Sequence, residues 1–425
     1  MKTASLSTEQ APPIAVPLRF FAIAPLFLLL AALIIAIYDT NPFVDAHSPA
    51  LLAATHCITI GFIGMIMQGA MQQILPVVIG SPMPASRQIA WLTLLPLIAG
   101  TLSLSAGFLQ GAPALLNLAW VLLGFGFVVF IAASLISLSR APAKTASKTA
   151  LLLSVLALTV AVILGALLAR GYATGMQLDY AKLAAAHISL ALGGWVTLLI
   201  IGVSYQVVPM FQLTPNYPHR LASALPPALF TSLLLYLCSI WLNAPALSYF
   251  AESLLWVLAV VFALTTLWLQ SRRRRRVADA TLSFFRLGMI SLLCAALLSA
   301  AALLSPSPAH FRTLSVSVFI LGFALSVIHG MLYKIVPFLV WFHLFRGGIK
   351  KGVPNMKQII PEAWMWRHLW LHIATLLAAL LSSVWTAAIR LFAIGLASEG
   401  VLLCFALYTG IAVYRRTLKK LVAST

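Results

Sequence analysis

Long apolar segments follow one another along almost the whole chain, and they limit the fold more than any other feature of the sequence. A transmembrane helix needs about 20 consecutive apolar residues to cross the hydrocarbon core of a bilayer. The sequence therefore predicts an all-α integral membrane protein with twelve transmembrane helices. The predicted spans are 19–38, 50–76, 88–109, 113–138, 149–170, 181–209, 220–242, 245–270, 281–304, 311–338, 364–388 and 390–414.

Composition and charge agree with a membrane protein. Of the 425 residues, 62% are hydrophobic and only 8% are charged, which excludes an ordinary soluble domain. The formal net charge of +19 comes from short basic runs between the apolar segments, so it indicates topology and not a nucleic-acid partner. These runs lie in the even-numbered connections and after the last span. We therefore expect an inner-membrane protein in contact with membrane lipid, with both termini cytoplasmic.

A short motif recurs three times. The sequence GAMQQILP at 69–76 returns as GVSYQVVP at 202–209 and as GMLYKIVP at 330–337, on predicted spans 2, 6 and 10. Regular recurrence of this kind indicates an architecture built from repeats. We expect one transmembrane domain with three pseudo-symmetric four-helix repeats. Their approximate limits are 19–140, 149–272 and 281–416.

Two histidines lie at matched depth on two of the motif helices. His56 precedes Pro76 by 20 residues and His187 precedes Pro209 by 22, which as helix is ~30–33 Å. The difference of two residues turns the side chains to nearly opposite sides of their helices. In a threefold ring this turn directs both imidazoles into one space between spans 2 and 6. Ionisable groups inside spans favour a functional site; the alternative for each histidine is a hydrogen bond to a neighbouring carbonyl.

The motif helices carry a resemblance to a known family. Twelve spans in three groups, with histidine, glycines and a proline on spans 2 and 6, resemble the catalytic subunit of the heme-copper oxidases, and in particular the C-type cytochrome oxidases. The arrangement is also similar to the NnrS family of heme- and copper-containing membrane proteins linked to nitric oxide. The resemblance implies a heme-copper oxidase subunit I-like fold that binds heme b, with His56 and His187 as ligands of the heme iron.

We expect four glycines to make room for a flat macrocycle between these two histidines. The four residues are Gly61, Gly64, Gly193 and Gly194.

The departures from the family exclude its reaction. Heme-copper oxidases need a copper triad that includes a pair of histidines on span 7, and span 7 at 220–242 contains no histidine. On span 10 the positions that correspond to the heme-ligand pair are Ser315 and Ser317. Serine is not expected to hold heme iron, because that role usually falls to His, Met, Cys or Tyr. The chain is therefore not expected to be a terminal oxidase. A heme held by two histidines is six-coordinate, which favours electron transfer over gas activation.

The function expected from these features is electron transfer, or an accessory role in respiratory or nitric oxide metabolism, with a redox protein or a quinol as partner. One alternative is a transporter of copper or heme, but its pore would need polar groups along a continuous path, and here they gather at the two ends. Another alternative is a heme-based gas sensor, which would need an open iron position.

A second group of histidines is predicted on the inner half of the protein. His329 precedes Pro337 by eight residues, or ~12 Å of helix. His368 and His372 are four residues apart and share one helical face. The three side chains are candidates for a second site that holds a heme or copper; the alternative for His368 is an interfacial belt of tryptophans. Glu399 is a carboxylate inside a span, so it is either protonated and hydrogen-bonded or part of a proton route.

Overall fold

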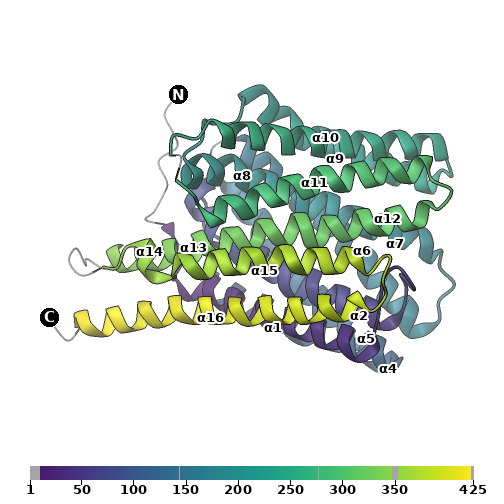
Figure 1. Cartoon of the computed structure of the whole chain (residues 1–425), viewed down its shortest axis with the longest axis horizontal. Helices are drawn as coiled ribbons and strands as arrows, with labels where there is room; N and C mark the ends of the chain where they lie inside the picture. The colour runs from purple at the N-terminus through teal and green to yellow at the C-terminus, as the bar shows by residue number, and fades with distance from the viewer. Residues whose placement is uncertain (1–9, 143, 276, 347–352, 423–425) are drawn as a thin grey trace. The chain divides into compact units, whose positions relative to one another are not determined.

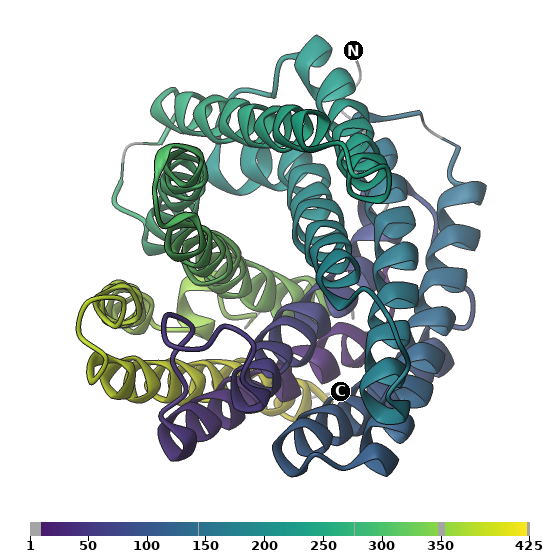
Figure 2. The same cartoon turned by 90° about the vertical axis from the view of Figure 1, so that its right-hand side faces the viewer.

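The computed structural model describes residues 10–142, 144–275, 277–346 and 353–422, and the regular structure of these residues is helical (Figure 1 and Figure 2). Helices satisfy every internal backbone N–H and C=O group within one segment, which a bilayer core requires. Eleven helical segments among the described residues are long and apolar enough to cross a membrane. The chain is thus a multi-pass α-helical membrane protein. The segments are Ala15–Tyr38, Pro49–Ile79, Ser86–Gln110, Pro113–Arg140, Ala146–Thr174, Tyr180–Gln212, His219–Trp241, Pro245–Ser271, Ala280–Leu304, Pro308–Phe345 and Ala388–Lys420.

The helix found at the eleventh predicted span differs from the prediction. Residues 364–388 were expected to cross the membrane, and the helix there, α15 (Glu362–Leu381), ends seven residues earlier than predicted. It is not among the eleven apolar segments. Arg367, His368 and His372 make it more polar than its neighbours. Both histidines are buried, so their side chains face other helices and not lipid.

The chain divides into two compact units, each assembled from segments that are distant in sequence. The first unit consists mainly of residues 70–276 and 289–316. The second consists of residues 13–69, 277–288 and 317–425. Each unit has its own buried aromatic side chains, such as Phe130 and Phe262 in the first and Phe62 and Phe284 in the second.

The first unit is a series of neighbouring helices. α4 packs on α5, α5 on α6, α6 on α8, and α9 on α10. Short turns connect several of these pairs; at the turn between α4 and α5, Gly111 adopts a left-handed φ of 58° that glycine accepts without strain. The bounds are α4 (Ser86–Gln110), α5 (Pro113–Arg140), α6 (Ala146–Thr174), α7 (Tyr180–Ile188), α8 (Thr197–Gln212), α9 (His219–Trp241), α10 (Pro245–Ser271) and α12 (Pro308–Ser317).

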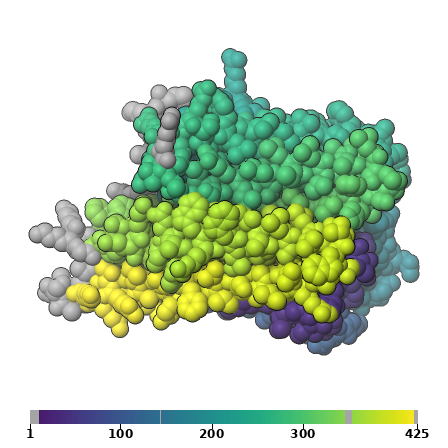
Figure 3. All heavy atoms as spheres, viewed as in Figure 1, coloured from purple at the N-terminus to yellow at the C-terminus, as the bar shows by residue number. Residues whose placement is uncertain are grey.

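The second unit is centred on α16 (Ala388–Val422), which packs against α1 (Ala15–Tyr38), α13 (Ser326–Arg346) and α15. Figure 3 shows the side chains of α15 and α16 lying along one another. Gly400 allows α1 to approach closely, because a Cβ at this position would lie 2.9 Å from Leu29 Cδ2. Small residues at such contacts are typical of helix packing in membranes. The second unit also contains α2 (Pro49–His56), α14 (Met356–Ile359), the first part of α3 (Met65–Ile74) and the first part of α11 (Ala280–Leu304).

The three helices that carry the repeated motif also share an unusual backbone feature. Each contains an eight-residue π-helix: η2 (Cys57–Gly64), η4 (Ser189–Val196) and η5 (Val318–Leu325). These begin 19, 20 and 19 residues before the motif prolines (76 − 57, 209 − 189 and 337 − 318). π-Helices are rare and are frequently found at functional sites. The motif helices therefore resemble one another in local backbone geometry as well as in sequence.

Many large apolar side chains remain exposed on the outer faces of the helices. Leu33 on α1, Leu297 on α11 and Tyr408 on α16 are 55%, 70% and 71% exposed. In water such surfaces would promote aggregation. On helices of this length they are the surfaces that contact lipid.

Candidate metal centre

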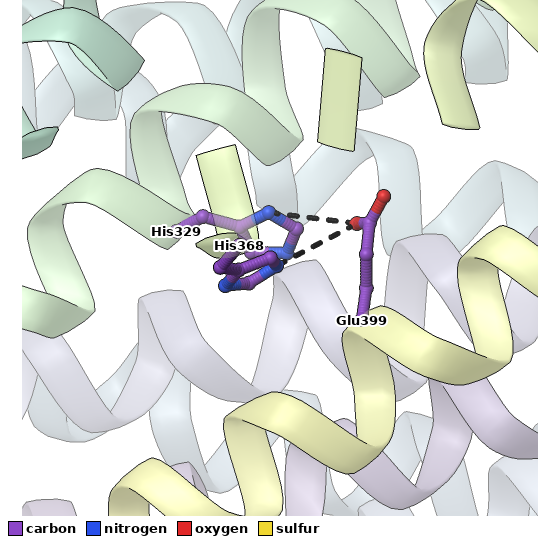
Figure 4. A group of neighbouring side chains, drawn as sticks. All are labelled: His329, His368 and Glu399. Carbon is purple, nitrogen blue, oxygen red and sulfur yellow. Dashed lines mark ion pairs between the residues drawn. The ribbon is translucent and has the colours of Figure 1, made fainter. Parts of the chain in front are cut away.

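A cluster of buried polar side chains lies within the second unit. His329 comes from α13, His368 and His372 from α15, and Glu399 from α16. All four are buried, with no more than 2% of any of them exposed. Figure 4 shows His329, His368 and Glu399 pointing toward one another from three different helices.

The carboxylate of Glu399 is the centre of this cluster. Its Oε2 atom lies 3.0 Å from His372 Nδ1, 3.7 Å from His329 Nδ1 and 3.9 Å from His368 Nε2. The imidazole rings themselves are close, with centroids 4.7 Å apart for His329 and His368 and 4.9 Å apart for His329 and His372. One carboxylate oxygen is therefore surrounded by three imidazoles.

The packing of the helices explains how the cluster forms. Because His368 and His372 are one turn apart on α15, they present their rings on the same side of that helix. α15 packs along α16, and α13 also packs against α16, so residues of all three helices meet at one level. Glu399 is eleven residues into α16, at the depth where the rings from α13 and α15 converge.

Two hydroxyl groups hold the imidazoles from behind. Tyr333 Oη lies 2.9 Å from His368 Nδ1, and Ser326 Oγ lies 2.9 Å from His372 Nε2. Since a carboxylate only accepts, His372 donates from Nδ1 to Glu399, and its Nε2 then accepts from the Ser326 hydroxyl. If His368 donates from Nδ1 to Tyr333, its Nε2 keeps the lone pair that a metal requires.

Several atoms of the cluster have no hydrogen-bond partner among the described residues. They are both ring nitrogens of His329, Nε2 of His368 and Oε1 of Glu399. An unsatisfied buried polar group costs about 1–3 kcal/mol, so such groups are rare in native proteins. Four such atoms in one cluster make it a candidate ligand site.

The donor atoms fit a transition metal. One atom each from His329, His368 and Glu399 can be chosen so that all three lie within 4.8 Å of one another. Metal bonds of ~2.0–2.2 Å place neighbouring donors roughly 3–3.5 Å apart. The His–Glu separations of 3.7 and 3.9 Å are slightly longer, within the reach of small side-chain movements. Imidazole and carboxylate ligands suit iron, zinc, copper(II) or nickel, whereas copper(I) prefers sulfur.

Aromatic rings enclose the site. Phe62 packs edge-on against His329 with centroids 5.5 Å apart, and Phe284 packs against His368 at 5.4 Å. These rings exclude water and lower the local dielectric constant, which strengthens every electrostatic interaction within the cluster.

The structure brings together the three histidines that the sequence placed in a second site. His368 lies inside the helix bundle with none of its surface exposed, so it is not part of an interfacial belt. The sequence had not assigned Glu399 to this group. A carboxylate within a span was the one sequence feature that marked Glu399 as a candidate functional residue. Its partners are identified only by the packing of α16.

His56 and His187 belong to different units, so each is described in its own surroundings. His56 Nδ1 lies 2.7 Å from Leu52 O of its own helix, and His187 Nδ1 lies 2.9 Å from Ala161 O on α6. A carbonyl only accepts, so Nδ1 carries the proton in both rings, and in the neutral imidazole Nε2 carries the lone pair. A ligating histidine commonly shows this arrangement. That the two bind one heme stays a prediction.

The glycines expected beside the heme have neighbours of their own. A Cβ at Gly61 would overlap the ring of Phe27, and a Cβ at Gly194 would lie 2.5 Å from Ala157 Cβ. A Cβ at Gly193 would lie 3.3 Å from Leu233 Cδ2, whereas a Cβ at Gly64 would approach only the backbone of its own helix. At least Gly61 and Gly194 thus permit close contact between helices within their units.

Comparison with known proteins assigns neither a family nor a function to this chain. No family model matches the sequence, and no curated protein is significantly similar to it.

Proposed function

We propose that this chain is a membrane redox protein with a transition-metal centre held by His329, His368 and Glu399. The proposal rests on one observation: the buried, unpartnered atoms of these three residues converge from three helices. Within this proposal the chain works in electron transfer, or as an accessory protein in respiratory or nitric oxide metabolism, with a redox protein or a quinol as its partner. The twelve-helix, three-repeat architecture related to heme-copper oxidase subunit I belongs to the same proposal.

Two features favour a metal over a network of hydrogen bonds alone. A purely structural network would pair its polar atoms, because a partly satisfied buried network is less stable than an apolar core. In this cluster both nitrogens of His329 lack a hydrogen-bond partner among the described residues. The contacts of Tyr333 and Ser326 also orient the rings from behind, as second-layer partners of metal ligands do. Bound here, a redox-active ion would supply one-electron chemistry in a water-excluded site.

Metal analysis of the purified protein tests this proposal. We expect close to one transition-metal ion per chain in addition to any iron accounted for by heme. Glu399→Gln and the double variant His329→Ala/His368→Ala should lose it. Glu252→Gln is the matched control, because it removes the charge of a carboxylate in a helix of the first unit and should leave the metal in place. Retention of the metal by the Glu399 and His329/His368 variants would contradict the proposal.

A second proposed cofactor is heme b, with His56 and His187 as its ligands. The observation that favours it is the Nδ1-to-carbonyl contact of both imidazoles, which leaves the lone pair on Nε2. Absorption spectra of the oxidised and reduced protein test it. We expect a six-coordinate low-spin spectrum that His56→Ala or His187→Ala abolishes and that Ser317→Ala leaves unchanged. An intact spectrum in the double variant His56→Ala/His187→Ala would exclude this heme site.

A further inference from the structure

A cavity of about 380 Å³ lies in the first unit, where α8 ends and the connection after α10 begins. Its polar lining includes Arg274, Tyr205, Gln206 and Asn216. Its apolar lining includes Met210. Arg274 gives the cavity a positive charge, and none of the described residues that line it is a carboxylate.

The backbone around the cavity is held in place by two hydrogen bonds. Gln270 near the end of α10 donates from Nε2 to Oε1 of Gln212 at the end of α8, at 2.9 Å. The backbone N–H of Arg274 donates to Leu213 O, also at 2.9 Å. The main chain of Arg274 is therefore fixed to the end of α8. Only its side chain has to become ordered when a ligand binds.

Tyr205 supplies a second donor. Its ring packs edge-on against Tyr217, with centroids 4.9 Å apart, and the hydroxyl of Tyr217 is bonded to Thr266 Oγ1 at 2.8 Å. The hydroxyl of Tyr205, in contrast, is buried and has no hydrogen-bond partner among the described residues. Because Tyr205 lines the cavity together with Arg274, a small rotation of its ring would let this unpartnered hydroxyl donate to an oxyanion bound there.

The position of the cavity indicates the source of this oxyanion. Arg274 belongs to the run of arginines that directly follows the apolar helix α10, and Arg272 in the same run lies over the ring of Trp268, 4.3 Å from its centroid. Arginine and tryptophan at the end of a membrane helix mark the level of the lipid headgroups. Basic pockets between transmembrane helices at this level bind anionic headgroups.

We propose that this cavity binds the phosphate group of an anionic phospholipid. Arg274 and Tyr205 donate to the phosphate oxygens, Gln206 and Asn216 offer further polar contacts, and Met210 borders the first carbons of the lipid. The site lies in the first unit and does not depend on the metal centre of the second.

Native mass spectrometry of the full chain in detergent tests the proposal, with phosphatidylglycerol as the probe. We expect Arg274→Gln to raise the apparent Kd for phosphatidylglycerol at least tenfold and Tyr205→Phe to raise it several-fold. The matched controls are Arg415→Gln, which removes a basic residue after the last span, and Tyr408→Phe, which removes an exposed hydroxyl; both should bind as the unchanged protein does. Gel filtration and thermal unfolding of each variant would show that it is folded.

Two results would overturn the proposal. Unchanged phosphatidylglycerol binding by a folded double variant Arg274→Gln/Tyr205→Phe would show that the cavity is not the site. If millimolar inorganic phosphate displaced phosphatidylglycerol, and phosphate binding depended on the same two residues, the ligand would be free phosphate and the lipid assignment would be wrong. Equal binding of phosphatidylcholine would likewise contradict an anionic headgroup.

Discussion

His372 donates from Nδ1 to Glu399 Oε2 at 3.0 Å, and its opposite nitrogen is held by Ser326 Oγ at 2.9 Å. The imidazole therefore links the carboxylate of α16 to a hydroxyl of α13. In the proposed metal centre His372 is a positioning residue that fixes Glu399, and it need not touch the ion.

This role predicts a specific defect for His372→Ala. Loss of a second-layer partner typically lowers metal affinity by about 10–100-fold. We expect the Kd for the metal to rise by this factor while the stoichiometry at saturating metal stays at one. Titration of the metal-depleted protein measures both, and His343→Ala, on α13, is the control. Loss of binding even at saturation would show that His372 is itself a ligand.

Gly165 on α6 makes room for the ring of His187. A Cβ at this position would lie 2.9 Å from His187 Cε1, so Gly165→Leu should push the imidazole from its contact with Ala161. If His187 binds heme, the low-spin spectrum should weaken as it does in His187→Ala. Gly124→Leu is the control, because nothing lies within 4 Å of a Cβ there. An unchanged spectrum in Gly165→Leu would argue against His187 as a ligand.

Asp279 caps the start of α11 and pairs with α13. Its Oδ1 accepts from the backbone N–H of Thr281 at 2.9 Å, and its Oδ2 lies 2.9 Å from Lys334 Nζ. We expect Asp279→Ala to lower the free energy of unfolding by about 1–3 kcal/mol, through loss of the cap and of a partly exposed ion pair. Unfolding in mixed micelles measures the change. Asp45→Ala, in an exposed loop, should change it by less than about 0.5 kcal/mol.

Asp39, just after α1, gives the second unit a dependence on pH. Its carboxylate accepts hydrogen bonds from Arg390 Nε at 2.9 Å and from Arg390 Nη2 at 2.6 Å. The hydrogen bonds from Arg390 lower the pKa of Asp39 below its usual range. The folded form therefore gains stability above the unfolded pKa of about 4, and this gain is lost as pH falls through the lower folded pKa.

Acid unfolding of Asp39→Asn checks this dependence. The thermal midpoint of the unchanged protein should fall more steeply between pH 5 and pH 3 than that of the variant, because the variant has no carboxylate to protonate. High salt should reduce the difference, since the pair is exposed. Equal slopes for the two proteins would show that Asp39 has no part in acid sensitivity.

Local signals in the sequence were sufficient for most of the helices and for part of the candidate site. The span predicted at 113–138 is the helix Pro113–Arg140, because an apolar run bounded by proline and arginine defines its own ends. The four-residue spacing of His368 and His372 likewise placed both rings on one face. Glu399 could not be added to them from sequence, since its contact with α15 depends on how two helices pack. The π-helices were not predicted from sequence either, although each begins 19 or 20 residues before a motif proline.

The π-helix η5 has a consequence for the metal centre that lies beyond its own residues. It ends four positions before His329 on one continuous helix, so its wider winding sets the angle at which every later side chain leaves the axis. Removing a single residue between 318 and 325 would turn that imidazole by about 100°, away from Glu399, although no member of the cluster had changed. The geometry of the centre thus depends on the number of residues in η5 as well as on the four side chains that form it.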